Sequence, residues 1–171
     1  WRANNTGEYW YVYHASLGVN KTIFLQLPNA EIGFTITNST APTSTHFTLS
    51  GGGLNTSNAT YIAYLFATLA GVSKVGSYTG TGNNLNVDCG FSAGARFILI
   101  KRTDSTGDWY VWDSVRGIVA GNDPYLLLNS TAAQVTNTDY VDPLSSGFTV
   151  TSSAPAALNA SGGTYIFLAI A

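Results

Sequence analysis

Two stretches of this chain, LNTSNATYIAYLFA at residues 54–67 and LNASGGTYIFLAIA at residues 158–171, are near copies of each other. Both begin with Leu-Asn, pass through Thr-Tyr-Ile and end in an apolar run that closes with Ala. From the opening Leu to the closing Ala, matched residues lie 104 positions apart. Because solenoid repeats have periods of about 20 to 50 residues, this longer period predicts duplicated units of the size of a β-sandwich.

Other matched residues extend the repeat upstream with slightly smaller spacings. Tyr11 and Tyr110 are 99 positions apart, and Pro42 and Pro143 are 101 apart. The spacing changes at turns, where insertions are best tolerated. This predicts an N-truncated first repeat at residues 1–71 and a complete second repeat at residues 72–171, either as two units or merged into one larger sandwich. The chain starts at Trp1, partway through a repeat, so we expect a fragment or a processed product.

Short β-branched and aromatic runs, separated by Gly, Asn, Ser and Pro, predict an all-β, antiparallel sandwich with no long helix. A hairpin-type turn is expected at residues 4–8. Strand alternation puts Trp109 and Val111 on one face and Tyr110 and Trp112 on the other, so this strand is predicted to be central. The predicted strands are residues 10–14, 23–27, 47–49, 60–67, 74–78, 85–91, 96–102, 109–113, 125–128, 148–150 and 164–171.

The strand predicted at residues 60–67 needs neighbours that the first repeat does not contain. In a complete unit such a strand is followed and preceded by others, but the upstream part of this repeat stops at Trp1. An incomplete sandwich exposes strand edges, which is unfavourable. We therefore expect residues 60–67 to pair either with strands from outside the chain or with the second repeat.

Composition restricts the possible partners. Charged residues make up only 9% of the chain and the net charge is −2, against about 25% charged residues in an ordinary domain. This excludes the basic surface that nucleic-acid binding requires, and no apolar run approaches the ~20 residues of a membrane span. The single cysteine, Cys89, cannot form a disulfide within the chain, and we expect it to be a buried small hydrophobe.

The candidate catalytic residues are few. Residues 90–94 match the G-x-S-x-G motif around Ser92, but a predicted strand follows it where serine hydrolases have a helix. His14 and His46 are too few and too far apart for a histidine metal site, and His14 is expected to be exposed at the end of a strand. We predict no enzyme activity, no catalytic residues and no cofactor.

The acidic residues are predicted to act as turn formers, because Asp side chains bond to nearby backbone groups in turns. Asp104 and Asp108 form a calcium candidate, since hard cations bind carboxylate oxygens. Aromatic residues are numerous, and exposed aromatics are common at interfaces. The predicted contact residues, some of them in the loops at residues 118–124 and 135–146, are Tyr9, Trp10, Tyr13, Tyr110, Trp112, Asp123 and Tyr140.

Several motifs carry a family resemblance. They are VGSYTGTG at residues 75–82, VDCGF at 87–91, FILIKRTD at 97–104, GDWYVWDS at 107–114 and NASGGTYI at 159–166. As a set they resemble a domain of unknown function that recurs in tandem in tail, fibre and other virion proteins of tailed phages, especially marine cyanophages. The resemblance implies a jelly-roll, concanavalin-like or SPRY-like sandwich and supplies no catalytic residues.

The resemblance implies a non-enzymatic virion component that works by assembly and by contact with the host surface. Its expected partners are copies of itself in a homo-oligomer, other virion proteins, and a host glycan or protein. One alternative is a capsid decoration protein. Another is a glycan-binding or glycan-hydrolysing concanavalin-like domain, and hydrolysis would need two carboxylates about 5 to 10 Å apart in a groove.

Overall fold

The computed structural model describes residues 2–3, 9–51 and 54–171. The turn predicted at residues 4–8 lies outside the described residues. The described chain is nearly all β, with antiparallel pairing throughout, and this confirms the predicted fold class. None of the described helices has the length and apolarity that crossing a bilayer requires.

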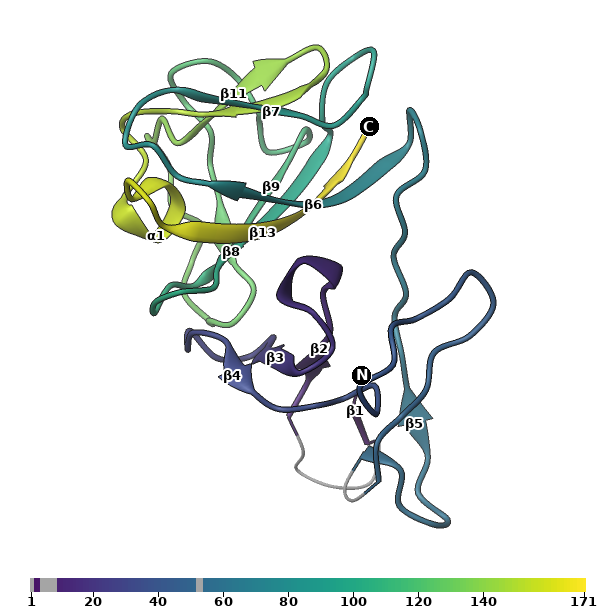
Figure 1. The fold of residues 1–171 in the computed structure, drawn as a ribbon. Coiled ribbons are helices and arrows are strands. Elements are labelled where there is room, and N and C mark those ends of the chain that lie inside the picture. The colour runs from purple at the N-terminus through teal and green to yellow at the C-terminus, as the bar shows by residue number, and fades with distance from the viewer. Residues whose placement is uncertain (1, 4–8, 52–53) are drawn as a thin grey trace.

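Two sheets formed by residues 73–170 face each other (Figure 1). The five-stranded sheet has the order β10 (Leu126–Leu127), β9 (Trp109–Asp113), β8 (Phe97–Arg102), β13 (Thr164–Ile170) and β6 (Ser73–Thr79). The three-stranded sheet has the order β11 (Val141–Leu144), β12 (Gly147–Val150) and β7 (Leu85–Asp88). Strands far apart in the sequence therefore lie side by side, since β6 and β13 join over seven residue pairs.

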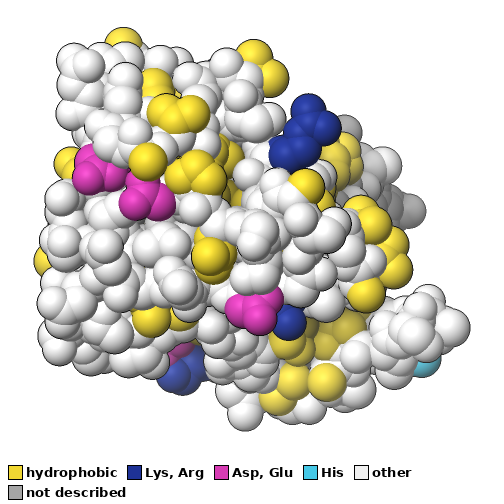
Figure 2. Space-filling model, turned by 90° about the horizontal axis from the view of Figure 1, so that it is seen from above, with side chains coloured by type: hydrophobic (Ala, Val, Ile, Leu, Met, Phe, Trp, Pro, Cys, Tyr) yellow, Lys and Arg dark blue, Asp and Glu magenta, His cyan; other side chains and the backbone are white. Residues whose placement is uncertain are grey.

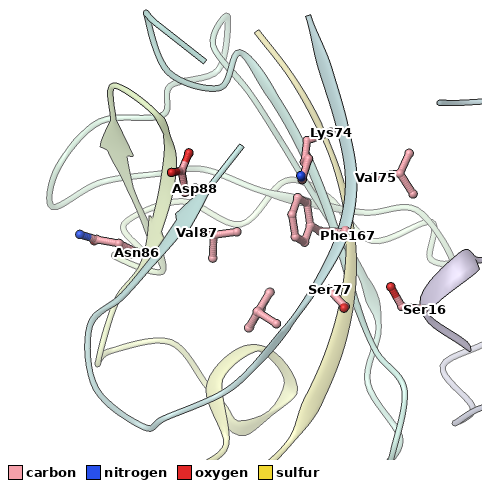
Figure 3. Close-up of a pocket in the computed structure, with 10 residues that line it drawn as sticks. Ser16, Lys74, Val75, Ser77, Asn86, Val87, Asp88 and Phe167 are labelled. Atoms are coloured by element: carbon pink, nitrogen blue, oxygen red, sulfur yellow. The ribbon is translucent and has the colours of Figure 1, made fainter. Parts of the chain in front are cut away.

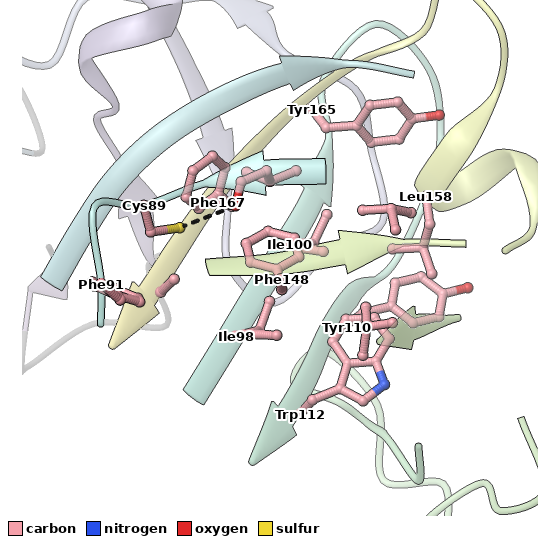
Figure 4. Close-up of a cluster of buried hydrophobic side chains, with 14 residues drawn as sticks. Cys89, Phe91, Ile98, Ile100, Tyr110, Trp112, Phe148, Leu158, Tyr165 and Phe167 are labelled. Atoms are coloured by element: carbon pink, nitrogen blue, oxygen red, sulfur yellow. Dashed lines mark hydrogen bonds between the residues drawn. The ribbon is translucent and has the colours of Figure 1, made fainter. Parts of the chain in front are cut away.

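The main core fills the space between these two sheets (Figure 4). Strand alternation aims Tyr110 and Trp112 of β9 into it, together with Phe148 of β12 and Tyr165 of β13. The opposite face of β9 carries Trp109, which is buried as well. Because β9 has a neighbour on each side, β8 and β10, the prediction that this strand lies inside its sheet is confirmed.

The N-terminal part covers the outer face of the five-stranded sheet. It consists of β1 (Arg2–Ala3) paired with β5 (Tyr61–Ile62), and of β2 (Tyr11–Val12), β3 (Lys21–Phe24) and β4 (Ile32–Gly33), with the 3₁₀ helix η1 (Ala15–Leu17) after β2. Ile23 of β3 forms a second buried cluster with Trp109 and Ile166. The five-stranded sheet is thus packed on both faces.

Hydrogen bonds to backbone carbonyls fasten this part to the five-stranded sheet and to the loop after β8. The indole Nε1 of Trp109 donates to the carbonyl of Phe24 at 2.9 Å. The amide of Glu31 donates to Thr103, and the amide of Gly107 donates to Pro28, both at 2.9 Å. The division of the chain at residue 71 stays a prediction.

Some element predictions were wrong. Residues 47–49 form no strand, and the strand predicted at residues 60–67 is reduced to β5. β4, β11, η1 and the short helix α1 (Ala156–Asn159) were not predicted. β11 contains Asp142 and Pro143, which favour turns, and it lies within the predicted contact loop at residues 135–146. It lies at the edge of its sheet, where Pro needs no donor on its outer side.

Candidate functional site

The sandwich is open along one side, between β6 of the large sheet and β7 of the small one. A shallow hollow of about 420 Å³ lies there, lined on its two sides by residues that include Lys74, Tyr78, Val87 and Asp88. Figure 3 shows Lys74 and Phe167 pointing toward Val87, whereas Val75 points to the other side of the sheet. The hollow therefore reflects the alternation of β6 and, in the part of the chain that the structure describes, the lack of a strand that would join the two sheets.

Phe167 reaches this hollow because a glycine lies beneath its ring. A Cβ atom on Gly76 would lie 2.6 Å from Cζ of Phe167, which is closer than side chains tolerate. Gly76 and Phe167 are paired across β6 and β13. The glycine thus lets the ring lie against the β6 backbone and form the floor of the opening.

A second hollow of about 410 Å³ continues the first and shares Lys74 and Asp88 with it. Cys89 also lines it, and burial raises the pKa of this thiol to about 11, although the charge of Lys74 acts in the opposite direction. The thiol is therefore protonated at neutral pH and is not a nucleophile. This confirms the expectation that Cys89 is a buried small side chain.

An exposed apolar segment, residues 62–72, borders the second hollow and connects β5 to β6. Figure 1 shows it as an extended chain along the outside of the molecule. Thr68 ties its end to β6, since its Oγ1 accepts from the amide of Val75 at 3.1 Å and lies 3.3 Å from the Val75 carbonyl. Its exposed large apolar residues are Ile62, Tyr64, Leu65, Phe66, Leu69 and Val72.

The rest of the surface is predominantly uncharged. Figure 2 shows one face on which small apolar patches and a few charged side chains interrupt a mostly polar, neutral surface. Scattered single apolar residues are normal on proteins, whereas a contiguous run marks an interaction site. The exposed apolar segment is such a run. Sequence reasoning had indicated that residues 60–67 need neighbours, but nothing in the sequence pointed to Lys74 and Asp88 in the adjoining groove.

The predicted contact residues are distributed between surface and core. Tyr9 is 46% exposed, and Trp10, Tyr13 and Tyr140 are partly buried. Three further predicted contact residues, Tyr110, Trp112 and Asp123, are buried. Their burial leaves these three side chains no surface for a partner, which argues against the predicted contact role. Aromatic and loop positions favour exposure, which is the basis of the prediction for these residues, but both faces of β9 are covered here.

Asp123 instead holds the loop at residues 118–124 against the sandwich. Its carboxylate accepts hydrogen bonds from the backbone amides of Tyr140 and Val141 and from the indole Nε1 of Trp112, at 3.0 to 3.1 Å. Burial raises the pKa of Asp123 to about 6, and these hydrogen bonds oppose the shift. The residue is a structural acceptor at the start of β11.

The calcium candidate is occupied by protein partners. Arg102 Nε and Nη2 donate to the two carboxylate oxygens of Asp104, each at 3.0 Å, and this pair lowers the pKa of Asp104 to about 2. Asp108 accepts from the side-chain amide of Asn129 at 2.7 Å. A guanidinium on Asp104 repels a second cation. Within residues 2–3, 9–51 and 54–171, no group of three or more His, Cys, Asp or Glu could hold a metal ion.

His14 is not an exposed strand end, so that prediction was wrong. It is buried, and its Nδ1 accepts from the amide of Ser16 at 3.1 Å, which caps η1. The loop after β2 turns inward and packs η1 near β6, which removes His14 from water. Ser92 of the G-x-S-x-G match lies in a bend before β8, so a strand follows it as predicted.

Lys101 is the ionisable group that sequence reasoning missed. It is fully buried, and its Nζ donates to the carbonyls of Pro28, Asn29 and Arg102 at 2.8 to 3.2 Å. The alternation of β8 places Lys101 on the face that the N-terminal part covers, opposite Ile100. The available signal was a lysine on the same strand face as Phe97 and Leu99, because a charged residue must find acceptors when that face is buried.

One family model matches the chain over residues 1–171, and its description is Domain of unknown function (DUF7483). The chain belongs to this family. Comparison with curated proteins gave no match, and comparison with solved structures gave none. Membership in DUF7483 is consistent with the resemblance to a domain of unknown function, and it assigns no activity to the site.

Proposed function

We propose that this DUF7483 chain is a non-enzymatic structural and adhesion module of a phage virion, part of a tail fibre, an appendage or the particle surface. The observation that carries the proposal is the exposed apolar segment beside the open side of the sandwich. Residues such as Leu65 and Phe66 lie in water in the isolated chain. Apolar surface of this kind is stabilised when a partner covers it.

The placement of the ionisable groups supports assembly over catalysis. Lys101 and Asp123 are buried, and both form hydrogen bonds with backbone groups of the fold. Arg102 and Asp104 neutralise each other. The hollow between β6 and β7 is lined by one cation, Lys74, and one carboxylate, Asp88. Glycoside hydrolysis needs two carboxylates at a defined separation.

A particle-based experiment tests the virion assignment. Antibodies against the purified chain are applied to particles of a phage that encodes it, and gold labels are located by electron microscopy. We expect labels on the tail, fibre or particle surface, and labels confined to the capsid would indicate the decoration role. Particles that carry no label, with the protein present only in infected-cell lysate, would contradict the proposal.

A binding experiment tests the role of the segment. The double variant Leu65→Asn, Phe66→Asn removes two of its apolar side chains, and Val115→Asn is the matched control because Val115 is exposed but lies outside the segment. We expect the double variant to bind particles or host cells at least about 10-fold more weakly, the equivalent of about 1.4 kcal/mol, and the control to bind normally. Equal binding by all three proteins would exclude the segment as the contact.

A further inference from the structure

The segment that leads into β5 and the segment that leads into β13 share a turn. The amide of Thr56 donates to the hydroxyl of Tyr61 at 2.7 Å, and the amide of Ala160 donates to the hydroxyl of Tyr165 at 2.8 Å. Asn58 and Gly162, in the corresponding places, have φ of 62° and 78°. These residues are all 104 positions apart, so the two strands start from the same local structure.

The pairing of the two strands also corresponds. β13 pairs with β8 through Tyr165↔Arg102 and Ile166↔Lys101. β5 pairs with β1 through Tyr61↔Ala3 and Ile62↔Arg2. The partners Arg2 and Lys101 are 99 positions apart, as are Ala3 and Arg102, which is the spacing of Tyr11 and Tyr110. β1 therefore occupies the place of the last two residues of β8.

Beyond this point the two strands differ in their surroundings. β13 continues between β8 and β6, and Phe167, Leu168 and Ala169 are at most 9% exposed. In residues 1–71, by contrast, Tyr64, Leu65 and Phe66 are 61 to 74% exposed. The apolar segment that follows β5 thus extends past β1, and among the described residues the backbone of residues 64–66 has no hydrogen-bond partner.

We propose that residues 64–66 accept an antiparallel β-strand, in the register that β1 begins, from a polypeptide segment that belongs neither to residues 1–171 nor to a second copy of them. Strand β8, in residues 72–171, shows what this occupant resembles. Opposite Phe167, Leu168, Ala169 and Ile170 lie Ile100, Leu99, Ile98 and Phe97 of β8. The occupant is accordingly an uncharged extended segment with apolar residues on both faces, which gains main-chain hydrogen bonds by strand addition.

This inference rests on the proposed function only in treating assembly as the role of the segment. It concerns the partner's chemistry and register, and it requires neither a phage nor a particle. Failure of particle labelling would therefore leave strand acceptance in place. Failure of strand acceptance would leave a virion role that uses other surfaces.

The test adds to residues 1–171 five residues that copy residues 95–99, Ala-Arg-Phe-Ile-Leu, placed immediately before Trp1. By the 99-residue spacing, Trp1 corresponds to Ile100, so the copy of residues 95–99 continues the register. Alternate residues of a strand direct their amides to the same neighbour, and Thr164, which matches Thr60, faces β8 by accepting from the amide of Thr103. We therefore expect hydrogen exchange at the amides of Tyr64 and Phe66 to slow on the order of 100-fold, and the binding of an apolar fluorescent dye to fall. Size-exclusion chromatography confirms that the extended chain stays monomeric.

The control carries the same five residues with one Ser inserted before Trp1. A one-residue shift turns every side chain to the opposite face of the strand, so we expect little protection at Tyr64 and Phe66. A peptide copying residues 95–100, added in trans to the unmodified chain, gives a second measurement of the same amides. Protection in the extended chain or with the peptide, absent in the shifted chain, supports the inference.

Three outcomes would overturn it. One is the absence of protection with both the extension and the peptide. Another is equal protection by the shifted extension, which would mean that apolar contact without register is sufficient. The third is an unmodified chain that dimerises with residues 64–66 protected, which would make a second copy the occupant through this same edge.

Discussion

His14 is a buried histidine whose neutral form caps η1. Burial lowers its pKa below the usual 6.5, although the backbone of Phe167 acts in the opposite direction. The unfolded chain then binds more protons below pH 6.5, so the free energy of unfolding should fall as the pH drops from 6.5 through the folded-state pKa. Protonation would also remove the acceptor for the Ser16 amide.

His14→Asn is the variant that tests this, because Asn keeps a capping acceptor and does not titrate. Urea unfolding at pH 7.5 to 4.5 should give a smaller loss of stability for the variant than for the parent chain. The raised pKa of Asp123 has the opposite effect between about pH 4 and 6, but it is present in both proteins and cancels in the difference. Identical pH profiles would show that His14 does not contribute.

Asp123 and Trp112 provide a second prediction at the same scale. Replacing Asp123 by Asn leaves one oxygen for three N–H donors and turns an amide group toward them. Unsatisfied buried donors cost about 1 to 3 kcal/mol, so we expect a loss of that size in the free energy of unfolding. The exposed carboxylate Asp88→Asn is the control, and a neutral effect of Asp123→Asn would contradict the structural role.

Among the elements, β12 depends on a close approach to β7 at Gly147. A Cβ at this position would lie 2.1 Å from the carbonyl oxygen of Val87. Gly147→Ala should therefore separate the two strands and cost about 2 to 3 kcal/mol. Gly33→Ala in β4 is the matched control, because a Cβ there meets nothing within 4 Å. Thermal unfolding of both variants distinguishes them, and equal melting temperatures would contradict the prediction.

Lys101 links β8 to the N-terminal part. Lys101→Met keeps the length of the side chain but leaves the carbonyls of Pro28 and Asn29 without their charged donor. We expect a loss of about 1 to 3 kcal/mol in unfolding free energy and faster proteolysis within residues 25–35. The result that would refute this role is unchanged proteolysis with normal stability.

At the scale of the whole molecule, the two halves contribute unequally to the fold. Among the described residues, those that form the core between the two facing sheets all come after Val72, whereas the N-terminal part packs on Trp109 and Ile166. We predict that residues 72–171 fold alone, with a lower stability and a red-shifted tryptophan emission from the uncovered Trp109. Residues 1–71 alone should not fold, and a stable monomeric fragment of residues 1–71 would contradict this.

Several features of the fold could be predicted from the sequence. β9 matched its predicted residues 109–113, and β6, β8 and β13 matched theirs to within one residue at each end. The alternation of Trp109 and Tyr110 between two faces was also predicted correctly. These features depend on neighbouring residues, since strand alternation and turn chemistry act within a few positions of the chain.

The candidate site could be predicted only in part. The sequence indicated that residues 60–67 need neighbours, but not that β5 would be reduced to two residues. It could not place Lys74 and Asp88 across an open edge, nor show that Tyr110, Trp112 and Asp123 are covered. Each of these depends on which distant strands pack together, and no local pattern contains that information.

The sequence by itself determined an all-β chain of short antiparallel strands in which residues 54–67 and 158–171 are alike. Only the tertiary structure decided their different environments. Residues 164–170 lie between β8 and β6 and are mostly buried, whereas residues 64–66 are exposed. The physical reason is that a strand is buried by its neighbours and not by its own residues, so the same apolar run becomes core in one half and surface in the other.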